Sequence, residues 1–166
     1  MAMTKGEVRL KVLRLTEEAF RPFGEIIAPQ AYNSAPADVD LDLSQGRPRF
    51  YMMTIMERGV SFDRITQHRK VTQCLASADG SEWYIGVAAA RPGAEGGPEP
   101  GIEDVHAFAV PGQVAVKLHC GTWHAGPYFK APSMAFFNLE LANTNTDDHR
   151  TILLGGGEGT TIVLDV

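Results

Sequence analysis

The sequence predicts a mainly β fold, an antiparallel barrel or sandwich with a few short helices. Two observations support this prediction. The 17 glycines and 10 prolines together exceed the usual combined share of about 12%, and they separate short apolar segments. Within these segments the side chains alternate with the period of two that strands require. The alternation is clearest over residues 82–90, 114–119 and 134–142.

The other elements are shorter and are justified by local signals. Thr16 is a candidate N-cap for a helix over residues 16–20, which Pro22 and Gly24 prevent from continuing. Further strands are expected at residues 8–15, 25–28, 49–56, around 71–75, and 160–164. Loops are expected at 31–48 (with room for one helical turn), 91–101 and 155–159, and a turn of helix at 102–106.

Composition limits the classes of function. With 44% hydrophobic and 21% charged residues, the chain is typical of a globular protein, and its length suits a single domain over residues 1–166. Lys and Arg number 15 against 20 Asp and Glu. Since no basic block is present, we expect a small-molecule partner and neither a nucleic acid nor a membrane surface.

The expected compartment is the cytoplasm. The first residues do not suggest a secretory leader, and no segment approaches the ~20 apolar residues of a membrane span. Cys74 and Cys120 lack the spacing of a metal site or a disulfide framework. Both thiols are therefore expected to be free.

Five histidines are the first candidates for chemistry near neutral pH: His68, His106, His119, His124 and His149. The strand at 114–119 places Lys117 and His119 on one face, and a tight turn leads to Trp123 and His124. Two imidazoles on either side of such a turn can converge on one point. His106 and His149 are expected to have structural roles.

A second candidate for a functional site lies on the strand expected at residues 134–142. Asn138 and Glu140 share a face with Met134 and Phe136. The carboxylate therefore lies either at the surface of the sheet or in a pocket.

Several segments between Leu15 and about Asp148 resemble the ureidoglycolate lyase family. The opening resemblance covers residues 15–27, and His68 is followed by the pair Thr72-Gln73. The most specific stretches are residues 107–113 and the pattern His119-x3-Trp123-His124-x2-Pro127. The resemblance implies a cupin-like double-stranded β-helix and a homodimer. It also implies an enzyme of allantoin and purine catabolism that releases urea from (S)-ureidoglycolate and leaves glyoxylate.

That reaction assigns roles to named residues. We expect His119 or His124 to be the general base, oriented by Glu140. Arg58 or Lys117 would hold the substrate carboxylate. The remaining predicted substrate contacts are His68, Gln73, Trp123 and Asn138.

A divalent metal is associated with some members of the family. A metal version of this site would use His68, His119 and Glu140, with Ni²⁺, Mn²⁺ or Zn²⁺ as the ion. The common cupin pattern His-x-His is interrupted, because Lys70 stands at its second position.

The sequence departs from the family pattern at the end of the strand around Glu140, where the family carries an Asp, and at two further positions that leave other functions open. Thr66 stands where the family carries a Glu, and Asp79 where it carries a Lys. The alternatives are a non-catalytic cupin that binds a small molecule, or a metal-dependent cupin enzyme acting on another small hydroxy acid.

Overall fold

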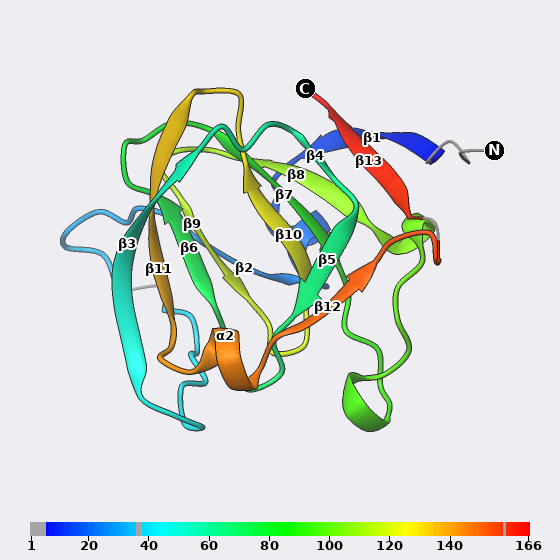
Figure 1. Ribbon diagram of the computed structural model, residues 1–166. Coiled ribbons are helices and arrows are strands. Elements are labelled where there is room, and N and C mark those ends of the chain that lie inside the picture. The colour runs from blue at the N-terminus through cyan, green and yellow to red at the C-terminus, as the bar shows by residue number, and fades with distance from the viewer. Residues whose placement is uncertain (1–5, 36–37, 158) are drawn as a thin grey trace.

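Two facing β-sheets form the framework of the computed structural model, which describes residues 6–35, 38–157 and 159–166 (Figure 1). In the described part of the chain, the larger sheet has eight strands in the order β12 (Arg150–Leu153), β5 (Arg64–Gln67), β10 (Trp123–Tyr128), β7 (Trp83–Ala88), β8 (His106–Val110), β1 (Gly6–Arg14), β13 (Thr160–Asp165) and β4 (Ser61–Phe62). The smaller sheet has five in the order β2 (Gly24–Ile27), β9 (Ala115–Leu118), β6 (Cys74–Ser77), β11 (Ser133–Leu141) and β3 (Pro48–Met56). This mainly β, cupin-like architecture confirms the predicted fold class.

Short helical turns connect the strands: α1 (Glu17–Phe20), α2 (Thr144–Asp147), and the 3-10 turns η1 (Ala94–Gly96) and η2 (Ile102–Asp104). The Thr16 hydroxyl accepts a hydrogen bond from the backbone N–H of Ala19 at 3.2 Å, as expected for the N-cap of α1. No helix long and apolar enough to cross a membrane occurs within the described ranges.

The apolar core fills the space between the sheets. Trp83 of β7 packs edge-to-face on Phe136 of β11, with the ring centroids 5.4 Å apart, and both side chains are fully buried. Phe20 of α1 closes one end of the core against Phe108 of β8. Because this core packs against both sheets, it fixes the position of one sheet relative to the other. The position of the space between their strand ends, where a cavity can form, is thereby fixed as well.

The strands predicted from the clearest alternation are confirmed as β7, β9 and β11. The strand expected around residues 71–75 begins only at Cys74, and β4, β5, β8 and β12 were not predicted. β12 has the mixed sequence Arg-Thr-Ile-Leu, and its pairing with β5 stabilises its extended conformation. Such a strand depends on a distant partner, so local periodicity cannot reveal it.

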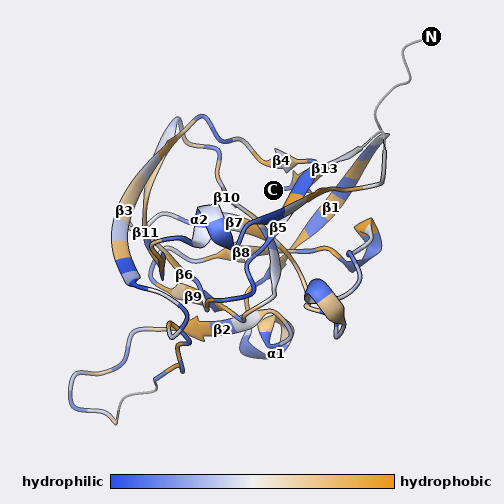
Figure 2. Ribbon diagram, turned by 60° about the horizontal axis from the view of Figure 1, so that its bottom comes forward, coloured by the Kyte–Doolittle hydropathy of each residue, from blue (hydrophilic) through white to orange (hydrophobic). Residues whose placement is uncertain are grey.

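The segment between β2 and β3 contains no helical turn in its described residues, 28–35 and 38–47. Part of it projects away from both sheets (Figure 2), whereas the carbonyls of Asp42 and Arg47 accept hydrogen bonds from the backbone N–H groups of Thr72 and Ala142.

Candidate active site

A polar cavity of about 530 Å³ lies between the ends of the two sheets. β5, β10 and β12 contribute one wall, β3 and β11 the opposite wall, and the residues around α2 close one end. The cavity contains three histidines, two arginines and a group of side-chain amides. A concave site with a few polar groups of this kind is typical of small-molecule binding.

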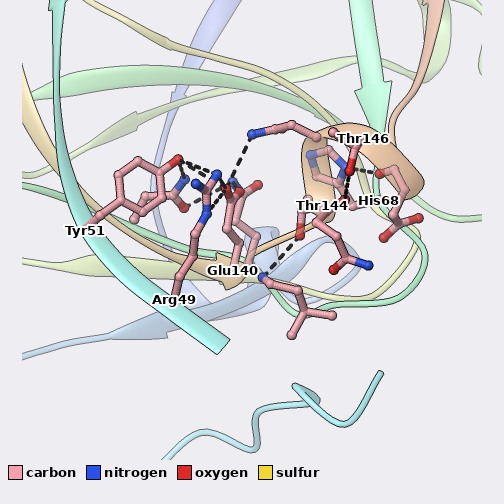
Figure 3. A network of polar contacts seen from close by, with 12 residues as sticks. Arg49, Tyr51, His68, Glu140, Thr144 and Thr146 are labelled. Carbon is pink, nitrogen blue, oxygen red and sulfur yellow. Dashed lines mark hydrogen bonds and ion pairs between the residues drawn. The ribbon is translucent and has the colours of Figure 1, made fainter. Parts of the chain in front are cut away.

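Glu140 is the centre of a hydrogen-bond network at the inner end of the cavity (Figure 3). The register of β11 against β3 places Glu140 directly opposite Arg49, and Asn138 opposite Tyr51. The Arg49 guanidinium forms an ion pair with Glu140 Oε1, which also accepts from the Tyr51 hydroxyl at 3.1 Å. Burial raises the pKa of Tyr51, so its phenol remains a donor.

The amides of Gln73 and Asn138 complete this network. Gln73 Nε2 donates to Glu140 Oε2 and to Asn138 Oδ1, each at 3.1 Å, and Asn138 Nδ2 donates to the Tyr51 oxygen at 2.8 Å. Asn138 and Glu140 thus lie in a pocket, which decides between the two interpretations of their strand. Among the described residues Glu140 bonds to no imidazole, so the expected Glu140–histidine contact is not formed.

Three imidazoles gather on the adjacent wall. The ring centroid of His68 lies 5.0 Å from that of His124 and 5.4 Å from that of His149. His68 and His124 are buried, whereas His149 is exposed at the mouth. His124 is brought here because it lies opposite Thr66 on β5, and His68 directly follows that strand.

Backbone carbonyls select the tautomer of both buried histidines. His68 Nδ1 bonds to the carbonyl oxygen of Asp148, and His124 Nδ1 lies 3.5 Å from that of Thr122. A carbonyl only accepts, so we assign the hydrogen to Nδ1 in each ring. In the described structure neither Nε2 has a hydrogen-bond partner.

Burial keeps both of these imidazoles uncharged. It lowers the pKa of His68, and with the neighbouring His68 and His149 it lowers the pKa of His124 to about 3. At neutral pH the cavity therefore presents two neutral rings, each with an unprotonated Nε2 that can accept a proton.

Cationic side chains line the outer part of the cavity. Arg58 and Arg64 both contribute to the wall, and the Arg58 guanidinium lies 5.0 Å from the centre of the Tyr128 ring. Burial raises the pKa of Tyr128 to about 12, which keeps its ring neutral beneath the cation. Arg58 thus lies where an anionic group could enter.

Three of the predicted site residues lie elsewhere. Lys117 is buried in an ion pair with Glu25, its direct neighbour on β2. His119 Nε2 bonds to the carbonyl of Arg21 at 3.1 Å and lines a separate cavity of about 460 Å³. Trp123 is completely buried in the core, beneath the guanidinium of Arg150.

The expected convergence of His119 and His124 is wrong for a topological reason. The strand before the turn, β9, belongs to the smaller sheet, whereas the strand after it, β10, belongs to the larger. The turn over residues 119–122 therefore crosses between sheets, and the two imidazoles face different cavities.

The residues present do not fit the metal set His68, His119 and Glu140. His119 lines the other cavity, and Glu140 is occupied by Arg49, Tyr51 and Gln73. Across the described ranges no group of three or more His, Cys, Asp and Glu side chains is arranged to hold a metal ion.

Thr66 reaches the cavity, whereas Asp79, another departure from the family pattern, does not. The Thr66 hydroxyl lies 2.8 Å from that of Thr151 on the paired strand β12. Asp79 instead accepts hydrogen bonds from the Ser77 hydroxyl and the backbone N–H of Ser81, which stabilise a turn outside the cavity.

The sequence did not indicate that Arg49, Tyr51 and Asp148 belong to the site, or that His149 lines the cavity. Alternation along residues 49–56 could have grouped Arg49 with Tyr51 on one face. Nothing local indicates that these two residues would lie opposite Glu140 and Asn138.

The two sheets and the polar, histidine-lined cavity between them place the chain among cupin-like proteins. A comparison with protein-family models matches residues 7–151 to the family described as ureidoglycolate lyase. The chain belongs to the ureidoglycolate lyase family, as its motifs predicted, and is therefore a lyase. No curated protein compared with the chain matched it.

Proposed function

We propose that this protein releases urea from (S)-ureidoglycolate and leaves glyoxylate, and that it does so in allantoin and purine catabolism. The proposal rests on one observation above all. Two neutral imidazoles with unprotonated Nε2 atoms share a cavity with Arg58 and with the amides around Glu140. Membership of the family supports the same assignment.

The substrate has a carboxylate at one end and a ureido group at the other, which matches the division of the cavity. Arg58 is the cation for the carboxylate, because a guanidinium can bind both of its oxygens. Asn138 and Asn145, at the other end, offer amide donors and acceptors to the ureido group. A site that pairs these groups rejects analogues that lack them.

The chemical step is a proton transfer coupled to C–N cleavage. His124 Nε2 accepts the proton of the substrate hydroxyl, and the C–O bond becomes the carbonyl of glyoxylate. The C–N electron pair moves to the ureido nitrogen, which takes the proton back from the imidazolium and leaves as urea. One base suffices because the oxygen and the nitrogen are attached to the same carbon, and no net proton is consumed.

Substrate binding would help this base. In the free protein burial depresses the pKa of His124. An anionic substrate brings a negative charge into the cavity, which favours the charged form of a nearby imidazole and raises its pKa. The base would therefore strengthen when the substrate carboxylate is in place.

A coupled assay for glyoxylate tests the proposal, using metal-stripped protein with and without added Ni²⁺, Mn²⁺ or Zn²⁺. Turnover without metal, lost in His124→Ala, is the expected result. Turnover only with metal would contradict the imidazole scheme while keeping the lyase activity. No turnover under any condition would contradict the proposed function.

A non-catalytic small-molecule-binding cupin is the second candidate. It is favoured by Thr66, which puts a hydroxyl into the cavity wall where the family carries an acid. Ureidoglycolate would then raise the melting temperature without being consumed.

We also propose a cytoplasmic homodimer. Both cysteines are free, as suits a reducing compartment. β3 is the last strand of the smaller sheet and exposes Phe50, Met52 and Met56 from alternate positions. A second copy would cover this apolar row and pair with the open edge of the strand.

A further inference from the structure

Asp148 connects the two segments that carry His68 and His149. It is buried at the end of α2, and the His149 backbone follows it directly. Its carboxylate accepts the backbone N–H of Arg69 through Oδ1 and that of Lys70 through Oδ2, each at 2.8 Å. Its own carbonyl accepts from His68 Nδ1. One residue therefore makes three bonds to three consecutive residues.

These bonds hold a segment that the sheets do not. β5 ends at Gln67, so residues 68–70 lie beyond the strand pairing that positions their neighbours. Apart from Asp148, one backbone bond reaches this stretch in the described structure, from the Gly121 N–H to the carbonyl of His68. The carboxylate of Asp148 thus holds the backbone directly after His68, while the Gly121 N–H holds the carbonyl of His68 itself.

We propose that Asp148 is a positioning residue for the proposed lyase reaction, which holds His68 in the Nδ1–H tautomer and keeps its ring against His124 and His149. The expected effect of Asp148 on turnover rests on the proposed function, whereas its effect on the His68 tautomer does not. The carboxylate anchors the backbone, the carbonyl takes the Nδ1 hydrogen, and the opposite nitrogen is left unprotonated.

The chemistry of the anchor requires a carboxylate. Two backbone N–H groups point at the two oxygens of Asp148. An asparagine would keep one acceptor and turn an NH₂ donor toward the other N–H, so one of the two bonds would be lost. The change from Asp148 to Asn hardly alters the volume, so it tests the hydrogen bonds rather than the packing.

Asp147 provides a matched control. It precedes Asp148, is exposed, and accepts a hydrogen bond from the Asn143 side chain at 2.9 Å outside the cavity. Asp147→Asn removes the same charge from the same part of the chain and leaves the His68 segment intact.

The experiment is ¹⁵N NMR of the imidazole nitrogens in the full chain, with the His68 signals assigned by their loss in His68→Gln. We expect the Nδ1–H tautomer in the unmodified protein and in Asp147→Asn, and a mixture of tautomers in Asp148→Asn. We expect kcat for ureidoglycolate to fall about 10- to 100-fold in Asp148→Asn, with KM changed much less, because a displaced His68 ring would move its neighbour His124, the proposed base.

The outcomes separate the two proposals. An Nε2–H tautomer of His68 in the unmodified protein overturns the positioning role, and this readout holds even when Asp148→Asn does not fold. A folded Asp148→Asn protein that keeps the pure Nδ1–H tautomer overturns it too. Absence of turnover in the unmodified protein overturns the proposed function, while the tautomer result still decides the role of Asp148.

Discussion

Arg49 and Glu140 face each other across β3 and β11, and the guanidinium forms an ion pair with a carboxylate that is only 1% exposed. The pair neutralises Glu140, a buried acid at the inner end of the cavity. Glu140, held by Arg49, accepts from the Gln73 amide, which in turn donates to Asn138. The shape of the inner end of the cavity therefore depends on the contact between Arg49 and Glu140 across the two strands.

Removing Arg49 should destabilise the protein strongly. Arg49→Met would leave Glu140 buried without its cation, which typically costs about 3–5 kcal/mol. Urea denaturation measures the loss, and the double variant Arg49→Met/Glu140→Gln should recover part of it. Arg47→Met is the control, since Arg47 is exposed and its side chain makes no hydrogen bond in the described structure. A loss as large in the control as in Arg49→Met would contradict the role of the ion pair.

His124 and His119 should differ sharply in their effect on turnover. His124→Ala removes the proposed base and should lower kcat about 10²–10⁴-fold. His119→Ala changes a side chain that lines the separate cavity and should leave kcat within about twofold, because this side chain does not reach the reacting atoms. The glyoxylate assay, with circular dichroism to verify folding, distinguishes them. Equal losses would argue against the placement of the reaction in the larger cavity.

Arg58 should control binding of the substrate carboxylate. Arg58→Gln keeps a polar side chain but loses the charge and the paired donors, so KM should rise at least about tenfold, with a smaller change in kcat. Arg9→Gln is a suitable control because Arg9 is exposed on β1 and pairs with Asp165. An unchanged KM in Arg58→Gln would assign the carboxylate to another group.

Acid should destabilise the protein through its buried histidines. The pKa of His124 falls from its ordinary value of 6.5 to about 3 on folding, and that of His68 is lowered as well, mainly by burial. Below pH 6.5 the unfolded chain therefore binds more protons at these histidines than the folded chain does. The free energy of unfolding is thus unaffected by these groups above pH 6.5 and decreases as the pH falls toward 3. Each such histidine gives a slope of up to about 1.4 kcal/mol per pH unit.

Urea denaturation at pH 7, 6 and 5 measures this slope. His124→Gln should flatten it, because the amide does not titrate. A slope that is the same in the variant would show that other groups cause the acid sensitivity.

The apolar row on β3 should determine the oligomeric state. Met52→Lys places a charge at the centre of the row, beside Phe137 on the neighbouring strand, and should convert a dimer into monomers. Analytical ultracentrifugation measures the mass. Glu57→Lys, just beyond the strand, is the charge-change control. A monomeric unmodified protein would contradict the dimer.

Local sequence patterns determined much of the framework. A period of two is a property of neighbouring residues, so it predicted β7, β9 and β11 and placed Asn138 beside Glu140 on one face. The cap at Thr16 followed from its side chain and from the residues next to it. The motifs around His68 and His124 were sufficient to predict the family.

Tertiary structure alone decided which of these side chains meet. Lys117 became unavailable to the site because the register of β2 against β9 places Glu25 beside it. His119 and His124 separated because the turn between them crosses from one sheet to the other. His68, His124 and His149 came together because β5 pairs with both β10 and β12. Strand pairing and register bring together residues far apart along the chain, and local periodicity does not encode which strands will pair.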